Sequence, residues 1–227
     1  MRRLFVVAAI LLALAVLAFR TDRETLRRAY QSMPRPAPGA DIRLDGVAWR
    51  QAARWDFRRG DFPHAWSWGE WRIVDGVLEG REDAGDFAVY FCPCEHRGDF
   101  LLETRVRFLP DSSGRVPEAH LLTRDSRDLH DESGAVLFGG QRRLSARHMV
   151  DGVDYVLRVV RPPEPVSVGD WHLLRFAVRD GRVQVWLDER RVFRSDQRYP
   201  SGTYREPHFA VRNGVAQFDG FRLLVAS

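Results

Sequence analysis

After residue 45, apolar and polar side chains alternate along the chain, and Asp-Gly pairs interrupt this alternation at short intervals. The clearest case joins residues 171–179 to 182–187 through Asp180-Gly181, a dipeptide that favours a two-residue hairpin loop. A loop of this length sets the register of the two strands, so Arg175 is predicted to face Trp186. The opposite side of the hairpin is uniformly apolar and is predicted to lie in the core: Leu174, Phe176, Val178, Val183, Val185 and Leu187.

The same pattern of short strands recurs along the rest of the domain, with no convincing helical periodicity. Residues 71–79 contain a second hairpin with an Asp-Gly pair, and residues 100–108 place alternate apolar side chains on one face. Residues 208–225 supply two closing strands near the C-terminus. We therefore predict an all-β fold, a two-sheet antiparallel jelly-roll sandwich of about ten short strands.

Residues 4–19 form an unbroken run of 16 apolar residues with arginines on both sides. A membrane-spanning helix needs about 20 apolar residues, whereas the core of a signal peptide needs about 7–15. We therefore predict that residues 1–20 form a hydrophobic helix, either a retained signal-anchor or a cleaved signal peptide. Residues 21–45 are charged and then rich in proline, which predicts a stalk before a jelly-roll domain at residues 46–227. The domain is then expected outside the cytoplasm, anchored in the inner membrane and facing the periplasm or cell exterior, or secreted if the signal is cleaved.

The charge of the chain is divided unevenly between the N-terminal segment and the domain. All 35 basic residues are arginines, against 31 acids, but residues 1–40 hold seven of the arginines and only two of the acids. This segment therefore carries +5, which predicts contact with anionic lipid headgroups, and the remainder carries −1. A body of this charge is a poor nucleic-acid binder, so we expect no nucleic-acid partner. The absence of lysine excludes Schiff-base catalysis and the lysine of a phosphate-binding loop.

Four segments of the domain resemble the strands of a known superfamily. They are WRIVDGVLEG at 71–80, GDFLLETRVRF at 98–108, GDWHLLRFAVRDGRVQVWLD at 169–188 and FDGFRLLV at 218–225. In this order they resemble the concanavalin A-like lectin/glucanase jelly roll, and within it the 3-keto-disaccharide hydrolase-like domains of bacterial exported proteins. The resemblance covers residues 50–227 and rests on hairpin turns and strand alternation, so it implies the fold more directly than an activity.

This superfamily includes sugar-binding modules, glycoside hydrolases, lyases and adhesion domains, so the resemblance implies a carbohydrate ligand. We predict an exported, membrane-tethered carbohydrate-binding protein of the cell envelope. Two alternatives stay open. One is a structural or protein-interaction module with no sugar site, and the other is a glycoside hydrolase or lyase that resembles the 3-keto-disaccharide hydrolases and acts on a di- or polysaccharide.

The predicted 171–187 hairpin has a polar face that suits sugar binding if it lies on the concave sheet. Trp186 would provide a stacking surface there, with Arg175 and Gln184 as hydrogen-bonding groups beside it. Arg105 and Arg158, on other predicted strands, are further carbohydrate-binding candidates. The alternative is that Trp186 is covered by a loop or lies on the convex side of the sandwich.

Acidic residues are most concentrated in the predicted loop at 125–132. Laminarinase-type hydrolases of the superfamily instead carry an E-x-D-x-x-E motif on one strand, and that motif does not occur in this sequence. Asp128, His130, Asp131 and Glu132, in this loop, are the remaining candidates for a catalytic acid and base. Neighbouring carboxylates separate their pKa values, as an acid/base pair requires. The alternative is a charged loop that is simply solvated.

The resemblance also implies a possible structural calcium ion, and no other cofactor is expected. The superfamily often binds calcium through an aspartate of the final strand, which corresponds to Asp219, and Asp56 is the best candidate for an N-terminal partner. Calcium takes about six to eight oxygen ligands, so two carboxylates form only part of a site. Alternatively, Asp219 and Gly220 form a turn or bulge within the strand.

Cysteine and tryptophan each cluster at one place in the domain. Cys92 and Cys94 are separated by a single proline, which would make a disulfide between them tight, and we predict packed or paired cysteines without a catalytic role. Most of the tryptophans near the start of the domain are predicted to pack the edge of the sandwich, although they could line one end of a groove. These tryptophans are Trp49, Trp55, Trp66, Trp68 and Trp71.

Overall fold

The computed structural model describes residues 41–57, 67–92, 94–110, 114–125, 132–150, 153–196, 198 and 203–227. The predicted signal segment and most of the predicted stalk, residues 1–40, lie outside these ranges. Within them, no helix is long and apolar enough to cross a membrane. The first strand, at residues 42–44, already lies within the segment predicted as stalk.

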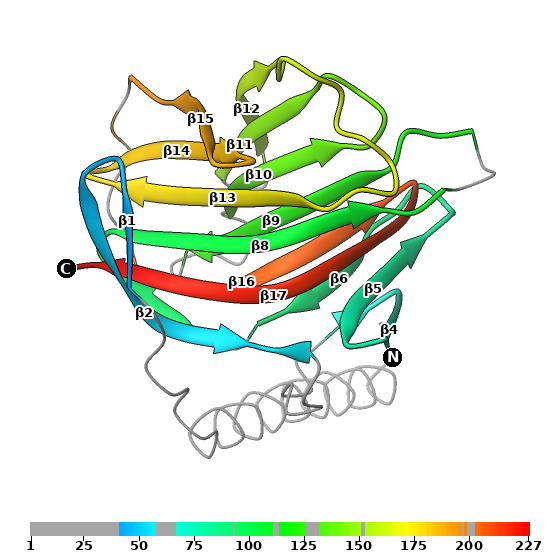
Figure 1. The fold of residues 1–227 in the computed structure, drawn as a ribbon, viewed down its shortest axis with the longest axis horizontal. Helices are drawn as coiled ribbons and strands as arrows, with labels where there is room; N and C mark the ends of the chain where they lie inside the picture. Colours follow the sequence, from blue (N-terminus) through cyan, green and yellow to red (C-terminus); the bar gives the residue numbers. More distant parts are fainter. Residues whose placement is uncertain are drawn as a thin grey trace, which may run out of the picture. The chain divides into compact units, whose positions relative to one another are not determined.

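Nine strands form one antiparallel sheet, which faces the viewer in Figure 1. Seven of them follow one another in the order β1 (Ile42–Leu44), β2 (Val47–Trp55), β17 (Gly214–Ala226), β8 (Phe100–Phe108), β13 (His172–Arg179), β14 (Arg182–Leu187) and β15 (Arg190–Arg194). In addition, β5 (Val77–Glu82) pairs with β17, and β4 (Glu70–Val74) pairs with β5.

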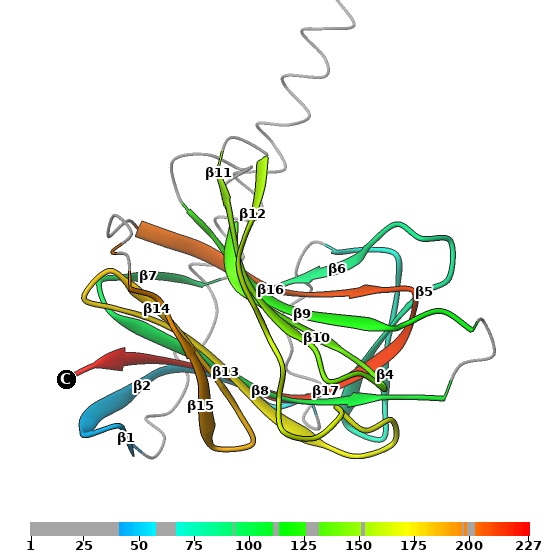
Figure 2. The same cartoon turned by 90° about the horizontal axis from the view of Figure 1, so that it is seen from above.

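Eight strands form the second antiparallel sheet, which lies behind the first in Figure 1. Its order is β12 (Val153–Val160), β11 (Leu144–Val150), β10 (Glu132–Phe138), β9 (Glu118–Asp125), β16 (Thr203–Arg212), β6 (Ala88–Phe91) and β3 (Ser67–Trp68), with β7 (Glu95–Arg97) on β16. Figure 2 shows the two sheets as separate layers, with β11 and β12 rising away from β9 and β16. This two-sheet sandwich confirms the predicted all-β fold.

The core between the two sheets holds the apolar residues that the alternation places inward. All six apolar positions predicted on the 171–187 hairpin are buried there. Phe209 of β16 and Phe218 of β17 stack across the two sheets, with ring centroids 4.4 Å apart. Because each buried side chain of this size stabilises the fold by roughly 1.5–3 kcal/mol, the alternation determines which face of every strand turns inward.

The β13–β14 hairpin forms as predicted because both of its turn residues adopt a left-handed conformation. The φ angles are 50° at Asp180 and 71° at Gly181. Such a turn matches the right-handed twist of the flanking strands. The resulting register pairs Arg175 with Trp186, as the loop length predicts.

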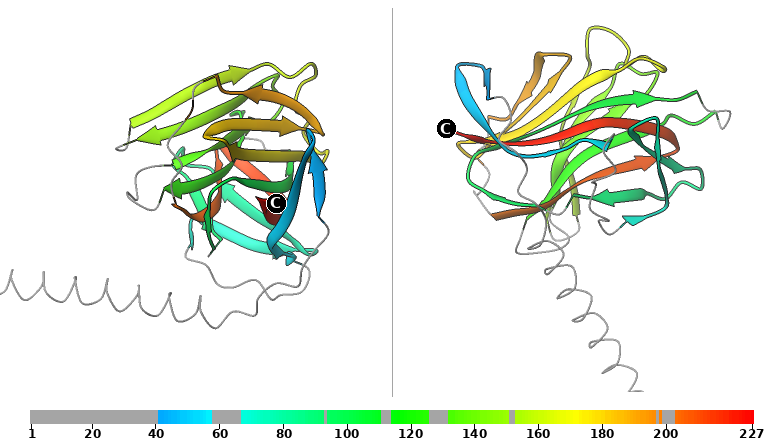
Figure 3. Two further views of the ribbon diagram at one scale, coloured as in Figure 1. Left: turned by 90° about the vertical axis from the view of Figure 1, so that its left-hand side faces the viewer. Right: turned by 60° about the horizontal axis from the view of Figure 1, so that its bottom comes forward.

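A second apolar cluster lies on the outer face of the nine-stranded sheet. The β1–β2 hairpin, blue in Figure 3, lies beside β14 and β15 and packs against this face. The buried members of the cluster are Trp49, Leu101, Ala177, Trp186 and Leu224. This outer face is therefore partly covered by the chain itself.

Candidate functional site

The outer face of the eight-stranded sheet holds a cavity of about 250 Å³. Its walls come from six strands of this sheet: β3, β6, β9, β10, β11 and β16. The sheet bends between β9 and β11, as Figure 2 shows. Its apolar lining consists of Trp68, Phe87, Val89, Leu122 and Ala210. Its polar lining consists of His120, Arg124, Glu132, Arg147 and His208.

Strand alternation explains why these side chains reach the cavity. Leu121 of β9 and Phe209 of β16 are opposite each other and point into the core. Their neighbours on the same strands must therefore point outward, which places His120 and His208 on the outer face. Two histidines on adjacent strands are thus brought to the floor of one cavity.

Glu132 links two other polar side chains of the cavity, His208 and Arg124. Its Oε1 atom lies 3.4 Å from Nε2 of His208 and 3.2 Å from Nε of Arg124. The other ring nitrogen of His208, Nδ1, donates a hydrogen bond to the backbone carbonyl of Glu206 (3.1 Å). Burial alone would raise the pKa of Glu132, but the charge and hydrogen bond of His208, together with Arg124, hold that pKa at about 2.

A second histidine–glutamate pair lies on β9, the strand between β10 and β16. Nε2 of His120 is 3.3 Å from Oε2 of Glu118, although the two atoms are not aligned as a directed hydrogen bond. Burial lowers the pKa of His120, and Glu118 offsets this only in part. Burial would raise the pKa of Glu118, but its contact with His120 and the charges of Arg212 and Arg147 lower it.

Aromatic rings form the apolar side of the cavity. The Trp68 side chain is 44% exposed, and its indole N–H donates a hydrogen bond to the Phe87 carbonyl (2.6 Å). The Phe87 ring meets His120 edge-on, with centroids 5.3 Å apart. The guanidinium of Arg124 lies 4.3 Å from the centre of the Phe91 ring. Trp68 is therefore held in place at the cavity edge with part of its ring open to a ligand.

The arrangement offers hydrogen-bond acceptors and donors next to an apolar ring. Glu118 and Glu132 are ionised at neutral pH because the pKa of each is lowered. The buried His120 is neutral there, since its pKa is lowered as well. The site is equipped to bind a ligand with several hydroxyl groups, whereas neither described carboxyl is adapted to donate a proton at neutral pH.

Of the residues predicted to be catalytic, the structure places Glu132 in the cavity. Asp128, His130 and Asp131 lie outside the described residues, so their role stays a prediction. Among the tryptophans, Trp49 is buried, and Trp55 and Trp71 pack against the main core. Trp68 is the one described member of that group that lines the cavity, and Trp66 lies outside the described residues.

The structure corrects the expectation of an open polar face around Trp186. Its side chain is 2% exposed and packs in the outer apolar cluster that the β1–β2 hairpin covers. Arg175 is buried beside it and donates a hydrogen bond to Glu103 (2.6 Å), and Gln184 is also buried. The physical reason is the hydrophobic effect. Packing the apolar side chains of β1 and β2 against this ring removes apolar surface of both from water, which stabilises the fold.

The other two predicted carbohydrate-binding arginines lie away from the cavity. Arg105 is exposed on the outer face of the nine-stranded sheet, and its Nη1 atom lies 3.4 Å from Oδ2 of Asp219. Arg158 is exposed on β12, a strand that contributes no described residue to the cavity lining. The structure therefore brings neither Arg105 nor Arg158 to the cavity.

Asp219, the predicted calcium ligand, lies at a β-bulge in β17 where Gly220 has a φ of 67°. Its carboxylate faces the guanidinium of Arg105. Asp56 follows the end of β2, the strand that pairs with this part of β17. Among the described residues, no group of three or more histidine, cysteine or acidic side chains is arranged to hold a metal ion, so the calcium site stays a prediction.

Cys92 and Cys94 are free thiols, and both are buried in the main core. Burial raises the pKa of each thiol, most strongly at Cys92, so neither is a thiolate at neutral pH. His96 is buried next to Phe100, with ring centroids 4.2 Å apart, and burial lowers its pKa to about 3. The three residues have the properties of core side chains.

Comparison with known proteins finds no matching family model and no matching curated protein. Solved structures do match. A carbohydrate-binding module, CBM66 from Bacillus subtilis, covers 68% of this chain and 91% of its own at 18% identity, with a TM-score of 0.57. An endo-β-1,3-glucanase from Pyrococcus furiosus covers 83% and 99% at 13% identity, with a TM-score of 0.59.

A galectin-like protein of unknown function from Bacillus subtilis covers 84% of this chain and 98% of its own at 12% identity, with a TM-score of 0.60. These neighbours are a carbohydrate-binding module, a glucanase and a galectin-like protein, which share the jelly-roll arrangement of two sheets. The chain thus has the concanavalin A-like lectin/glucanase jelly-roll fold, as its strand motifs predict. At these identities the likeness defines the fold, and the activity has to be argued from the site.

Proposed function

We propose that this protein binds carbohydrate in the cavity of the eight-stranded sheet. The observation that carries the proposal is the partly exposed ring of Trp68 beside the charged residues of the cavity. The proposal also includes export and a membrane tether at residues 1–20, which rest on the apolar run at 4–19 and its flanking arginines. The structural neighbours named as carbohydrate-binding and glucanase proteins support the same class of ligand.

The chemistry of the cavity suits a sugar ring. Each hydroxyl of a sugar both donates and accepts hydrogen bonds, so it can bridge the Glu132 carboxylate and the guanidinium of Arg124 or Arg147. The apolar C–H face of the ring can stack on Trp68. A volume of about 250 Å³ lies just below the range of about 300–1,000 Å³ that drug-sized ligands fill, which favours a single ring or the end of a chain.

Binding fits this site better than hydrolysis does. A glycosidase pairs an ionised carboxylate with a second carboxyl that keeps its proton near neutral pH, which requires a raised pKa. The pKa values of Glu118 and Glu132 are both lowered instead. The described part of the cavity therefore has the acceptors and donors of a binding site without the proton donor of a hydrolase.

The test is a glycan-binding measurement on the full-length protein and a Trp68→Ala variant. Loss of one aromatic stacking contact is expected to weaken binding about tenfold. Ile73→Ala is the matched control, because Ile73 is also an exposed apolar side chain, 48% exposed, but lies outside the cavity lining. It should leave the affinity unchanged.

Unchanged affinity of Trp68→Ala for a bound glycan would refute the site. Turnover of a sugar panel would favour the hydrolase instead. Finally, if no glycan binds while a neighbouring envelope protein co-purifies, the protein is an interaction module and the proposal is wrong.

A further inference from the structure

The outer face of the nine-stranded sheet is rich in arginine. Strand pairing places these side chains on the side opposite the core, because the residues between them, such as Leu102 and Val106 on β8, point inward. The arginines are Arg54, Arg72, Arg81, Arg105, Arg107, Arg175, Arg179, Arg182, Arg191, Arg194 and Arg222. The strand acids on the same side are Glu70, Glu79, Glu103 and Asp219. We call this surface the arginine face.

Ion pairs on the arginine face neutralise only part of its charge. Arg175 and Arg222 share the carboxylate of Glu103. Four more acids, on turns at the rim of the sheet, pair with arginines of the face: Asp45, Asp83, Asp180 and Glu189. Eleven arginines thus stand against eight acids that lie on the same side of the strands or pair with them, an excess of three arginines within this set.

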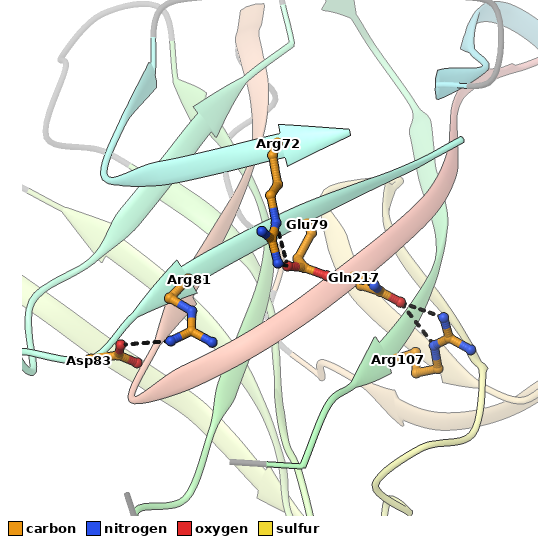
Figure 4. Close-up of polar contacts among 6 residues, drawn as sticks. All are labelled: Arg72, Glu79, Arg81, Asp83, Arg107 and Gln217. Atoms are coloured by element: carbon orange, nitrogen blue, oxygen red, sulfur yellow. Dashed lines mark hydrogen bonds and ion pairs between the residues drawn. The ribbon is translucent and has the colours of Figure 1, made fainter. Parts of the chain in front are cut away.

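A row of polar contacts holds several of these arginines in place, as Figure 4 shows. Arg72 donates to Glu79 through its Nε atom (2.8 Å), and Glu79 also accepts a hydrogen bond from Gln217 (2.7 Å). The Gln217 side-chain oxygen in turn accepts a hydrogen bond from Nε of Arg107 (3.0 Å). Arg107 thus has a neutral partner, so its positive charge is not cancelled.

Trp171 lies beside the same row and has the character of an interfacial side chain. The guanidinium groups of Arg107 and Arg105 lie 4.6 and 5.4 Å from the centre of its ring. Arginine next to tryptophan is a combination suited to the boundary between water and lipid, where a ring with one polar atom and a weakly hydrated cation are both stable.

Around the cavity of the eight-stranded sheet, by contrast, arginines and carboxylates are equal in number. Three arginines, Arg124, Arg147 and Arg212, face three carboxylates, those of Glu118, Glu132 and Glu206. Residues 41–227 together carry −1. The positive excess of the arginine face is therefore a product of folding, which collects arginines from distant strands on one side of the domain.

The first described strand of the domain lies at the arginine face. The first described strand, β1, packs Ile42 and Leu44 against the outer apolar cluster of that face. Residues 1–40, which hold the predicted membrane segment and carry +5, directly precede this strand in the sequence.

We infer that the arginine face binds the headgroups of anionic phospholipids and orients the sugar cavity, on the opposite sheet, away from the membrane. The inference rests on the membrane tether of the proposed function. Guanidinium groups recognise phosphate through paired charge-assisted hydrogen bonds, and each basic side chain near an anionic bilayer adds to the attraction.

The test is chemical modification of arginine by phenylglyoxal in the full-length protein, read residue by residue by mass spectrometry. The protein is reconstituted in nanodiscs of phosphatidylcholine, with or without phosphatidylglycerol. Anionic nanodiscs are expected to slow modification of Arg54, Arg72 and Arg105 several-fold. High salt should restore the rate, because it screens charges over a few ångströms. Arg158 on β12 is also exposed but lies on the other sheet, and its rate should not change.

Two variants test whether the arginines of the face bind lipid together. Arg54→Gln combined with Arg105→Gln should remove most of the protection of Arg72, whereas Arg158→Gln should leave it intact. Equal modification in both kinds of nanodisc would overturn the inference and leave glycan binding standing. If the protein does not remain bound to nanodiscs, both the inference and the predicted membrane tether are wrong. Protection by a soluble acidic polysaccharide in the absence of lipid would assign the face to a polymer instead.

Discussion

Replacing Glu132 by glutamine removes the carboxylate that His208 and Arg124 share at the floor of the cavity. Glutamine has almost the same size and keeps one oxygen acceptor, so the change isolates the charge. His208 and Arg124 are then left facing a neutral group. Removing one member of a buried charge cluster is among the most destabilising single changes.

The structure sets the size of the effect. The pKa of Glu132 is about 2 in the folded protein, against an ordinary value of 4.5, and its side chain is only 18% exposed. Each pKa unit corresponds to about 1.4 kcal/mol, so ionisation of Glu132 stabilises the folded state by roughly 3 kcal/mol. Because the folded-state pKa is the lower one, this contribution is complete above the ordinary value and is lost as the pH falls towards 2.

The assay is urea unfolding of the full-length protein in detergent, at neutral pH and at a series of acidic pH values. Glu132→Gln should reduce the free energy of unfolding by roughly 3 kcal/mol at neutral pH, and the difference from wild type should vanish as the pH approaches 2. Glu70→Gln, at an exposed position in β4, is the control and should change stability by less than about 0.5 kcal/mol. A neutral-pH difference below about 1 kcal/mol, or one that persists at acid pH, would refute the reasoning.

Two further predictions concern buried residues. Trp186→Ala should reduce the free energy of unfolding by about 3–5 kcal/mol, because it empties the centre of the outer apolar cluster, and the folded variant should keep its glycan affinity. A variant as stable as wild type would contradict the burial of Trp186. Cys92 and Cys94 should not react with N-ethylmaleimide in the native protein and should react once urea unfolds it, since burial raises the pKa of both thiols. Rapid alkylation of the native protein would contradict this.

Much of the local structure could be predicted from neighbouring residues. The Asp180-Gly181 turn set the register of β13 and β14, and the alternation around it identified the buried side of both strands. These features depend on turn conformation and on the two-residue period of a strand, which act over a few residues. They therefore leave a clear pattern in the sequence.

The candidate site could be predicted only in fragments. Glu132 was identified from a group of acids, and Trp68 was one of five tryptophans considered for a groove end. His120 and His208 are single polar residues between apolar ones, and Arg147 lies between Ala146 and His148 in a strand of mixed polarity, so the local pattern did not mark them as members of one site. They meet because β9, β11 and β16 belong to one bent sheet, and that depends on pairing between distant segments.

The sequence by itself determined that this chain is a sandwich of short antiparallel strands and which face of each strand is buried. Tertiary structure alone decided what happens to the outward faces. Trp186 is covered because β1 and β2 pack over it, whereas Trp68 stays partly open at the edge of a cavity. A domain whose charges sum to −1 acquires an arginine-rich surface, because strand pairing collects arginines from eight strands on one side. Burial on one face follows from local alternation, but exposure and charge on the other depend on which distant strands come together.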